Sequence, residues 1–180
     1  MKRAVIVHCW GGNPEYAWYP WAKHELEKRG YAVSIPRLPD TDHPQLSRWL
    51  PMLQQTIGQP DDELVLVGHS LGSVTILRYL ETSQPVGNVV LVAGFTEPLG
   101  FIELENFFEK RLDFATIKPK AQHFTVIQSD NDPYISAQYG NRLHDELGAK
   151  LVIKHHAGHM SGPVDGETSC LELPELLEAL

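Results

Sequence analysis

The sequence predicts an α/β fold in which helices cover both faces of a mainly parallel, doubly wound sheet. Two patterns predict it: short β-rich runs alternate with stretches whose apolar residues recur at helical spacing, and several of these runs are almost continuously apolar. The first pattern is typical of strands joined by crossover helices, and the second of strands buried on both faces. A length of 180 residues fits a single domain over 1–180 with a substantial core.

Six runs are predicted to be strands, and they are residues 4–7, 32–35, 64–67, 89–93, 124–127 and 151–153. Helical spacing of apolar residues predicts helices in four places, which are marked by Trp18, Trp21, Ala22 and Leu26, by Leu71, Val74, Leu77 and Leu80, by Phe101, Leu104, Phe108 and Leu112, and by Leu173, Leu176, Leu177 and Leu180. The first three are expected to be crossover helices and the last to pack onto the sheet. We expect 101–112 to be needed as a crossover, and therefore not to form a lid.

Charge and composition restrict the partners. The chain has 15 basic and 23 acidic residues and a net charge of −8, which disfavours nucleic acids and anionic membranes and favours a small-molecule substrate. The apolar run 4–7 after Lys2 and Arg3 is too short for a signal segment, and no later run approaches membrane-spanning length. Cys9 and Cys170 do not suggest a disulfide framework, so we expect a cytoplasmic protein.

The pentapeptide Gly68-His69-Ser70-Leu71-Gly72 follows the apolar run 64–67 and precedes a helical pattern. Strand, Gly-x-Ser-x-Gly and helix together are the context of a nucleophile elbow, in which a strained turn exposes the serine and glycine removes Cβ atoms that would clash. Ser70 is therefore the candidate nucleophile, and the N–H of Leu71 is aimed at the place where an oxyanion would form. The alternative is an ordinary glycine-rich turn with an unused serine.

Two later loops supply the other groups that a serine nucleophile needs. Ser129-Asp130-Asn131-Asp132-Pro133 follows the fifth predicted strand, and 155–160 follows the sixth with three histidines. Parallel strands gather their carboxyl ends at one edge, and the order serine, carboxylate, histidine is the one expected with this elbow. A histidine would take the proton of Ser70, and a carboxylate would orient that histidine. Either Asp130 or Asp132 could be the carboxylate, and the Ser-x-x-Asp-Pro spacing favours Asp132.

These features resemble the α/β-hydrolase superfamily, specifically small serine hydrolases related to retinoblastoma-binding protein 9 and bacterial YdeN-like proteins. The resemblance covers essentially the whole chain and is carried by His8-Cys9-Trp10-Gly11-Gly12, Trp18-Tyr19-Pro20-Trp21, the elbow, 129–133 and Gly158-His159. It implies a minimal, lidless fold, no metal or cofactor, and a triad of Ser70, Asp132 and His159. It also makes the Trp10 N–H the second oxyanion donor. Cys9 departs from the related sequences, which often have glycine there.

Several further residues are candidates for the substrate pocket, and they are His8, Gly11, His69, Phe95, Tyr134 and Met160. His69 could line the pocket or serve only the elbow, and the Trp10 indole could cover the acyl pocket or pack in the core. Tyr16 is assigned to packing or to the surface by default.

Metal, nucleotide and thiol chemistry are disfavoured. Asp130 and Asp132 have calcium-like spacing, but Tyr134 and Ile135 stand where further oxygen ligands and glycine should follow. The i, i+4 pair of His155 and His159 lacks the helix that a zinc pair uses, because a β-branched strand precedes it and glycine interrupts it. The loop at 11–14 lacks Gly-x-Gly-x-x-Gly. Cys9 has no assignable base, which favours a buried apolar role.

The sequence thus predicts a serine hydrolase that cleaves small carboxylic esters, or related acyl substrates, through an acyl-enzyme. Two other functions stay open. The first is a protein-interaction module on the same scaffold with weak or no activity, for which the protein partner is unidentified. The second is an acyltransferase that passes the acyl group to an alcohol or amine.

Overall fold

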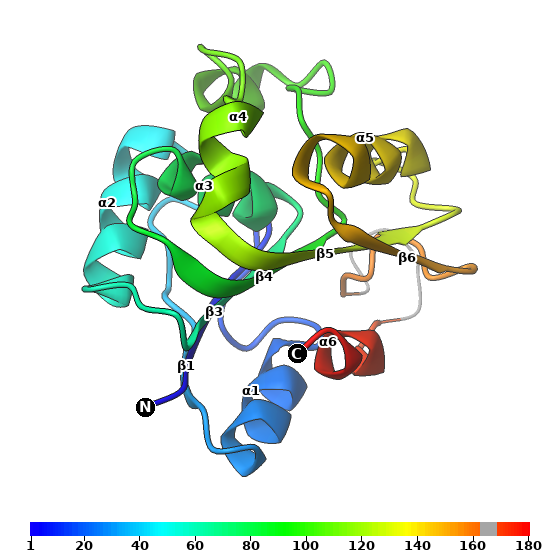
Figure 1. Ribbon diagram of the computed structural model, residues 1–180. Helices are drawn as coiled ribbons and strands as arrows, with labels where there is room; N and C mark the ends of the chain where they lie inside the picture. Colours follow the sequence, from blue (N-terminus) through cyan, green and yellow to red (C-terminus); the bar gives the residue numbers. More distant parts are fainter. Residues whose placement is uncertain (163–168) are drawn as a thin grey trace.

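The computed structural model describes residues 1–162 and 169–180. Six strands form one sheet in the order β2-β1-β3-β4-β5-β6, and every neighbouring pair is parallel (Figure 1). The strands are β1 (Arg3–Val7), β2 (Ala32–Ser34), β3 (Leu64–His69), β4 (Val86–Val92), β5 (Ala121–Ser129) and β6 (Lys150–Lys154). Each of the six predicted runs overlaps one of them. The predicted α/β fold with a parallel, doubly wound sheet is therefore confirmed.

Helices lie on both faces of this sheet. On one face are α1 (Tyr19–Lys28) and α6 (Pro174–Glu178), and on the other are α2 (Leu46–Ile57), α3 (Leu71–Leu80) and α5 (Ala137–Leu147), as Figure 1 shows. The alternate side chains of the central strands accordingly enter two separate apolar cores. Trp18 and Leu26 fill the core under α1, and Trp49 and Leu77 fill the core under α2 and α3.

Two of these helices, α2 and α5, were not among the predicted elements. The helix α2 contains Pro51, which lacks the N–H that would donate to the carbonyl of Ser47, yet the helix continues past it. Its buried residues Trp49, Leu53 and Ile57 recur at every fourth position, so tertiary packing outweighs the local penalty. In α5 the apolar pattern is sparse, and the helix presents Gly140 to the sheet.

The predicted helix over 101–112 is wrong. The structure has a 3₁₀-helix, η1 (Ile102–Phe107), then a loop, the short helix α4 (Phe114–Ile117) and a second 3₁₀ turn, η2 (Lys118–Lys120). Side chains take carbonyl groups that a continuous α-helix would use: Asn106 donates to Glu103 O at 2.8 Å, and the buried guanidinium of Arg78 donates to the carbonyls of Phe107 and Lys110. The segment is held in place without forming a helical cap.

The strand order places a crevice at the carboxyl ends of β1 and β3. From β1 the chain moves outward to β2, then returns to β3 on the other side of β1, and continues in that direction to β6. Loops that leave adjacent strands in opposite directions leave room between them, which is where ligands bind in such sheets. The first glycine-rich loop and the Ser70 elbow meet at this point.

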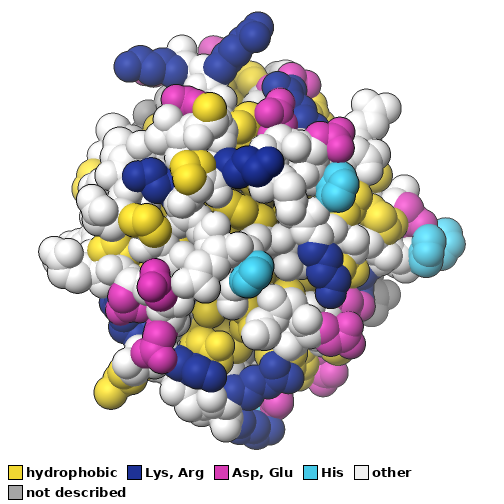
Figure 2. Space-filling model, viewed as in Figure 1, with side chains coloured by type: hydrophobic (Ala, Val, Ile, Leu, Met, Phe, Trp, Pro, Cys, Tyr) yellow, Lys and Arg dark blue, Asp and Glu magenta, His cyan; other side chains and the backbone are white. Residues whose placement is uncertain are grey.

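None of the helices in the described parts of the chain has the length and apolar content to cross a membrane. The face of the molecule in Figure 2 intersperses basic side chains with acidic ones rather than gathering either sign into one patch.

Candidate active site

Ser70 lies on a strained turn between β3 and α3. Its backbone angles are φ 54° and ψ −118°, a region that costs a residue with a side chain about 1–3 kcal/mol. Two hydrogen bonds hold the turn: the N–H of Ser70 donates to Val92 O at 2.8 Å, and the N–H of Ser73 donates to Ser70 O at 2.9 Å. The turn places Ser70 at the start of α3, on the carboxyl side of the sheet.

The two glycines of the elbow allow the close packing that this turn requires. A Cβ on Gly68 would lie 2.5 Å from the Cα of Ser73, and a Cβ on Gly72 would overlap the carbonyl oxygen of Val7. The first glycine therefore lets the turn fold back on itself, and the second lets α3 approach the end of β1.

His159 and Asp132 form a buried pair. The Nδ1 of His159 lies 2.7 Å from Oδ2 of Asp132, and the two side chains are only 9% and 0% exposed. The other carboxylate oxygen, Oδ1, accepts the backbone N–H groups of Tyr134 and Ile135, each at 2.9 Å. A carboxylate fixed by two amides is an acceptor for Nδ1–H, and this arrangement leaves Nε2 of His159 as the basic nitrogen.

Asp130 serves a different histidine. Its Oδ2 lies 2.6 Å from Nδ1 of His155, and its Oδ1 accepts the N–H of His156 at 2.8 Å. These hydrogen bonds, first that from the His156 backbone and then that from His155, lower the pKa of Asp130. The pair is at the surface, since the His155 side chain is 80% exposed. Of the two aspartates considered from sequence, Asp132 is the one next to His159.

The loops after β5 and β6 are joined by two polar side chains. The Oδ1 of Asn131 accepts from Gly158 N at 2.9 Å and from Ser129 Oγ at 2.8 Å. Ser129 Oγ also accepts from Ala157 N at 3.2 Å. Asn131 and Ser129 thereby hold the loop that carries Asp132 against the loop that carries His159, a role that the sequence reasoning did not assign to them.

A pocket of about 390 Å³ contains the candidate reactive groups. It is lined by Cys9, Trp10, Gly11, Tyr16, Asp42, Ser70, Leu71, Phe95, Leu99, Phe101, Leu104, Tyr134, Ile135, His159 and Ser161. Ser70 and His159 thus share one cavity with Leu71 and Trp10, the two candidate oxyanion donors. Of the substrate-pocket candidates, Gly11, Phe95 and Tyr134 line it, and the Tyr134 ring stands edge-on to His159 with centroids 5.2 Å apart.

Three other candidates, His8, His69 and Met160, lie outside this lining. All are fully buried. His8 accepts Leu38 N–H on Nε2, and its Nδ1 lies 2.8 Å from Cys9 O. Met160 is in the core under α1, where its carbonyl accepts the Trp18 indole N–H. His69 hydrogen-bonds to protein on both ring nitrogens. Their placement as pocket residues is corrected, because hydrogen bonds and core packing hold them inside the protein.

The sequence reasoning missed part of the pocket wall. Tyr16, assigned by default to packing or the surface, lines the pocket, as do Asp42 from the loop after β2 and three residues of the segment after β4. Phe101 packs edge-on against Trp10, with ring centroids 5.7 Å apart. Tyr16 and Asp42 both follow the carboxyl end of a strand, and this position could have indicated from sequence that they line the pocket. The segment after β4 forms part of the pocket wall, and among the described residues it builds no separate helical cap.

The elbow and the loop after β1 carry the candidate oxyanion donors. Leu71 begins α3, so its N–H is one of the first-turn donors that have no acceptor in the helix. Trp10 is held by its indole N–H, which donates to Asp42 O at 3.0 Å, while Gly11 N–H donates to Thr41 O at 2.9 Å. Cys9 is 5% exposed, and burial raises the pKa of its thiol to about 11, so the thiol stays protonated at neutral pH.

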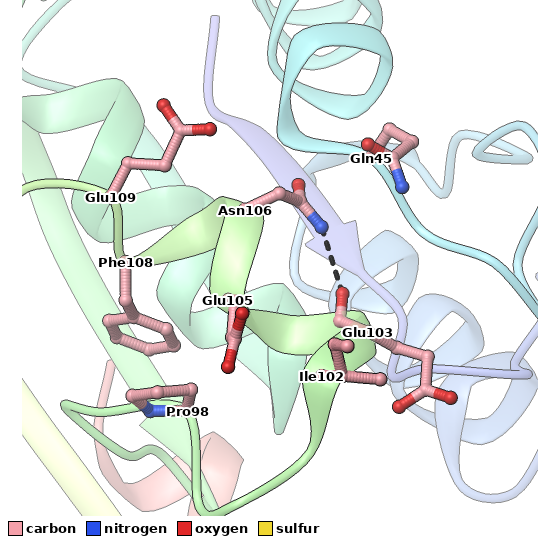
Figure 3. Close-up of a pocket in the computed structure, with 8 residues that line it drawn as sticks. All are labelled: Gln45, Pro98, Ile102, Glu103, Glu105, Asn106, Phe108 and Glu109. Atoms are coloured by element: carbon pink, nitrogen blue, oxygen red, sulfur yellow. Dashed lines mark hydrogen bonds between the residues drawn. The ribbon is translucent and has the colours of Figure 1, made fainter.

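A larger hollow of about 610 Å³ lies along η1 (Figure 3). Glu103, Glu105 and Glu109 line it together with Asn106, whose amide donates to Glu103 O. None of the candidate catalytic residues lines this hollow, and the acidic groups would repel an oxyanion. The smaller pocket around Ser70 is therefore the candidate active site.

Comparison with known proteins shows the family to which the chain belongs. A family model described as serine hydrolase matches residues 4–166, which is most of the chain. The chain belongs to the serine hydrolase family. Among its relatives, YdeN of Bacillus subtilis (strain 168) is 31% identical over 162 residues, covering 88% of this chain and 85% of YdeN. The serine hydrolase RBBP9 of Rattus norvegicus is 30% identical over 162 residues, covering 87% of this chain and 86% of RBBP9.

Solved structures of other proteins share the fold. The B. subtilis ydeN gene product superposes with a TM-score of 0.91 at 29% identity, covering 99% of this chain and 96% of that chain. Est1E of Butyrivibrio proteoclasticus, solved with ferulic acid bound, has a TM-score of 0.73 at 12% identity, covering 90% of this chain and 82% of that chain. The second likeness concerns the fold alone. The resemblance to YdeN-like and RBBP9-like serine hydrolases is confirmed.

Proposed function

We propose that this serine hydrolase cleaves small carboxylic esters through a covalent acyl-enzyme on Ser70. The observation that carries the proposal is the shared pocket: a serine on a strained elbow and a histidine paired with a buried carboxylate line the same cavity. Serine alone is a weak nucleophile, and a neutral imidazole with its second nitrogen fixed is the usual means of activating it.

In the first half of the reaction, Ser70 Oγ attacks the ester carbonyl carbon as its proton passes to Nε2 of His159. The carbonyl oxygen becomes an oxyanion, which accepts hydrogen bonds from the N–H groups of Leu71 and Trp10. Asp132 stabilises the imidazolium through Nδ1–H. The tetrahedral intermediate then collapses, the carbon–oxygen bond to the leaving alcohol breaks, and His159 returns the proton to that alcohol.

In the second half, His159 takes a proton from water, and the resulting hydroxide attacks the acyl carbon. The same N–H groups hold the second oxyanion, and Ser70 leaves with the proton from His159. Each half needs His159 to change from base to acid. No further group is required to balance the reaction.

The pocket size predicts the acyl chain length. A cavity of about 390 Å³, walled in part by Leu99, Phe101 and Leu104, suits short or medium acyl groups. We expect kcat/KM for p-nitrophenyl esters to peak at short or medium chains, without a rise in activity when the substrate exceeds its solubility limit. Initial rates across a chain-length series, below and above that limit, measure both properties.

A maximum at long chains with activation by droplets or micelles would contradict this expectation. It would show that the segment after β4 moves as a lid. No ester turnover above the uncatalysed rate would contradict the proposed function itself and favour the protein-interaction module.

The pocket also predicts a preference for charge on the acyl group. Asp42 Oδ1 lies 4.0 Å from where a Cβ on Gly11 would stand, and no lysine or arginine is among the described residues lining the pocket. Aromatic rings, including those of Trp10 and Phe101, add faces that attract cations. We expect kcat/KM to be about 1.5–5-fold higher for a cationic than for an anionic ester of matched shape, since an exposed charge pair contributes about 0.2–1 kcal/mol.

The matched substrates are p-nitrophenyl esters of 4-(trimethylammonio)butanoate, its neutral isostere 5,5-dimethylhexanoate, and glutarate. Asp42→Asn should remove most of the difference in kcat/KM among the three esters. Asp62 is an exposed aspartate before β3, at the other end of the sheet, so Asp62→Asn should preserve that difference. An anionic ester that is hydrolysed fastest by the wild-type enzyme would refute the inferred charge preference.

A further inference from the structure

His69 precedes the candidate nucleophile but has no access to the pocket. Its side chain is fully buried, with Nδ1 2.7 Å from the hydroxyl of Tyr19 and Nε2 2.9 Å from the backbone carbonyl of His159. The Tyr19 hydroxyl also accepts the N–H of Cys9 at 3.1 Å. Cys9, Tyr19, His69 and His159 thus form one unbroken hydrogen-bonded chain, which we call the Tyr19–His69 relay.

The direction of every hydrogen bond in the relay follows from its two ends. The carbonyl of His159 can only accept, so Nε2 of His69 carries a proton and donates it. Burial, together with the neighbouring His159, lowers the pKa of His69 to about 3, so the ring is neutral and Nδ1 is an acceptor. The Tyr19 hydroxyl therefore donates to Nδ1, and its oxygen is free to accept from Cys9 N–H, which can only donate.

The relay joins the three parts of the candidate active site. Cys9 immediately precedes Trp10, whose N–H is a candidate oxyanion donor, and His69 immediately precedes Ser70. At the far end, the relay holds the main chain of His159, whose ring lies 5.1 Å from the ring of His69 between centroids. Tyr19 is the first residue of α1. Its hydroxyl group therefore links the start of this helix to the loop after β1 directly, and to the His159 loop through His69.

We propose that Tyr19 and His69 are positioning residues that set the Trp10 loop, Ser70 and His159 relative to one another. This inference rests on the proposed function, because it assigns a catalytic consequence to groups that touch no substrate. Reacting groups displaced by about 1 Å can lose on the order of 10²-fold in rate. A hydroxyl that fixes two loops at once is placed to cause such a displacement when it is removed.

Tyr19→Phe is the most conservative test, because it removes one oxygen and keeps the ring in the core. We expect kcat for a short p-nitrophenyl ester to fall about 10–100-fold with KM within about threefold, since orientation rather than substrate binding is lost. Tyr79→Phe is the matched control, since Tyr79 is 4% exposed and its hydroxyl has no hydrogen-bond partner among the described residues. It should keep the wild-type kcat.

His69 is tested by rescue. His69→Leu removes both hydrogen bonds, whereas His69→Gln keeps an amide donor for the His159 carbonyl, so the glutamine variant should recover a large part of the kcat lost in the leucine variant. Adding Tyr19→Phe to His69→Leu should cost little more than His69→Leu alone, because both break the same relay. Circular dichroism and urea unfolding of each variant separate lost catalysis from lost fold.

The hydrogen-bond directions are measured without any substrate. Nitrogen-15 spectra of the imidazole rings should show His69 as the neutral Nε2–H tautomer, unchanged from about pH 5 to 8. The Nδ1–H tautomer, or titration in that range, would overturn the relay.

The kinetic outcomes distinguish the relay from the proposed function. If Ser70→Ala leaves ester hydrolysis intact, the proposed function fails and the positioning role fails with it. If hydrolysis depends on Ser70 but folded Tyr19→Phe keeps the wild-type kcat, the positioning role alone is refuted. A fall in Tyr19→Phe activity that matches its unfolded fraction refutes it as well, because the hydroxyl then serves only stability.

Discussion

Ser70→Ala should lower kcat for ester hydrolysis by about 10⁴–10⁶-fold, and His159→Ala should be nearly as severe. Ser70→Ala removes a single oxygen from a residue that lines the pocket, and no core volume, so the fold and the pocket should be retained. His159→Ala leaves the nucleophile without a base. Because the two residues act in the same step, the double variant should lose little beyond either single variant.

The measurement is the initial rate of p-nitrophenyl ester hydrolysis by each purified variant, with urea unfolding to verify the fold. Ser161→Ala is the matched control, because Ser161 lines the same pocket and is also buried. It should keep kcat within about tenfold of the wild type. Multiplicative losses in the Ser70 and His159 double variant would show that the two residues act independently, against the mechanism.

Asp132→Asn should lower kcat by about 10⁴-fold. The carboxylate accepts Nδ1–H of His159 at 2.7 Å and two backbone N–H groups through its other oxygen. An asparagine in this place would keep its oxygen on the backbone donors and turn its NH₂ group toward His159. That orientation favours the tautomer with the proton on Nε2, which cannot accept the proton of Ser70.

Asp130→Asn is the matched control for Asp132→Asn, since the two residues share a loop and each contacts a histidine. Its partner His155 is at the surface, so kcat should change by no more than about threefold. The same ester assay, with circular dichroism for the fold, compares the two variants. A larger loss in Asp130→Asn would assign the orienting carboxylate to Asp130 instead.

The strands could be predicted from sequence because each is a short apolar run, and parallel strands buried on both faces leave that pattern. The helices were harder to predict from sequence. Trp49, Leu53 and Ile57 of α2 have helical spacing, but Pro51 among them disfavours a helix. Tertiary packing, which the sequence does not reveal, decides whether the helix forms. In 101–112, the apolar spacing suggested a helix, but the buried Arg78 from a distant helix takes its carbonyl groups.

The candidate catalytic residues could be predicted from sequence because their order along the chain is tied to the chemistry. Ser70, Asp132 and His159 follow strand ends in the order expected with the elbow, and parallel topology gathers strand ends at one edge. Neighbours in sequence were less reliable guides to the pocket. His69 and Met160 adjoin pocket residues, yet both are fully buried and lie outside the pocket lining. Ser70 and Met160 both have a positive φ, so the chain turns at these positions and the alternation of an extended strand does not predict where the side chains lie.

Tyr19 illustrates a role that sequence reasoning could not assign. Its position in the first helix suggests only packing, and its partners Cys9 and His69 are separated from it by 10 and 50 residues. The relay becomes visible only when the sheet brings β1 and β3 side by side under α1.

Reaction with a fluorophosphonate tests most directly whether Ser70 is an activated nucleophile. The wild-type protein should take up one phosphonyl group, detected by intact mass spectrometry, and peptide mapping should place it on Ser70. Ser70→Ala should stay unlabelled, and His159→Ala should react much more slowly. Folded wild-type protein that stays unlabelled, or that carries the label on another residue while Ser70 is unmodified, would contradict the account.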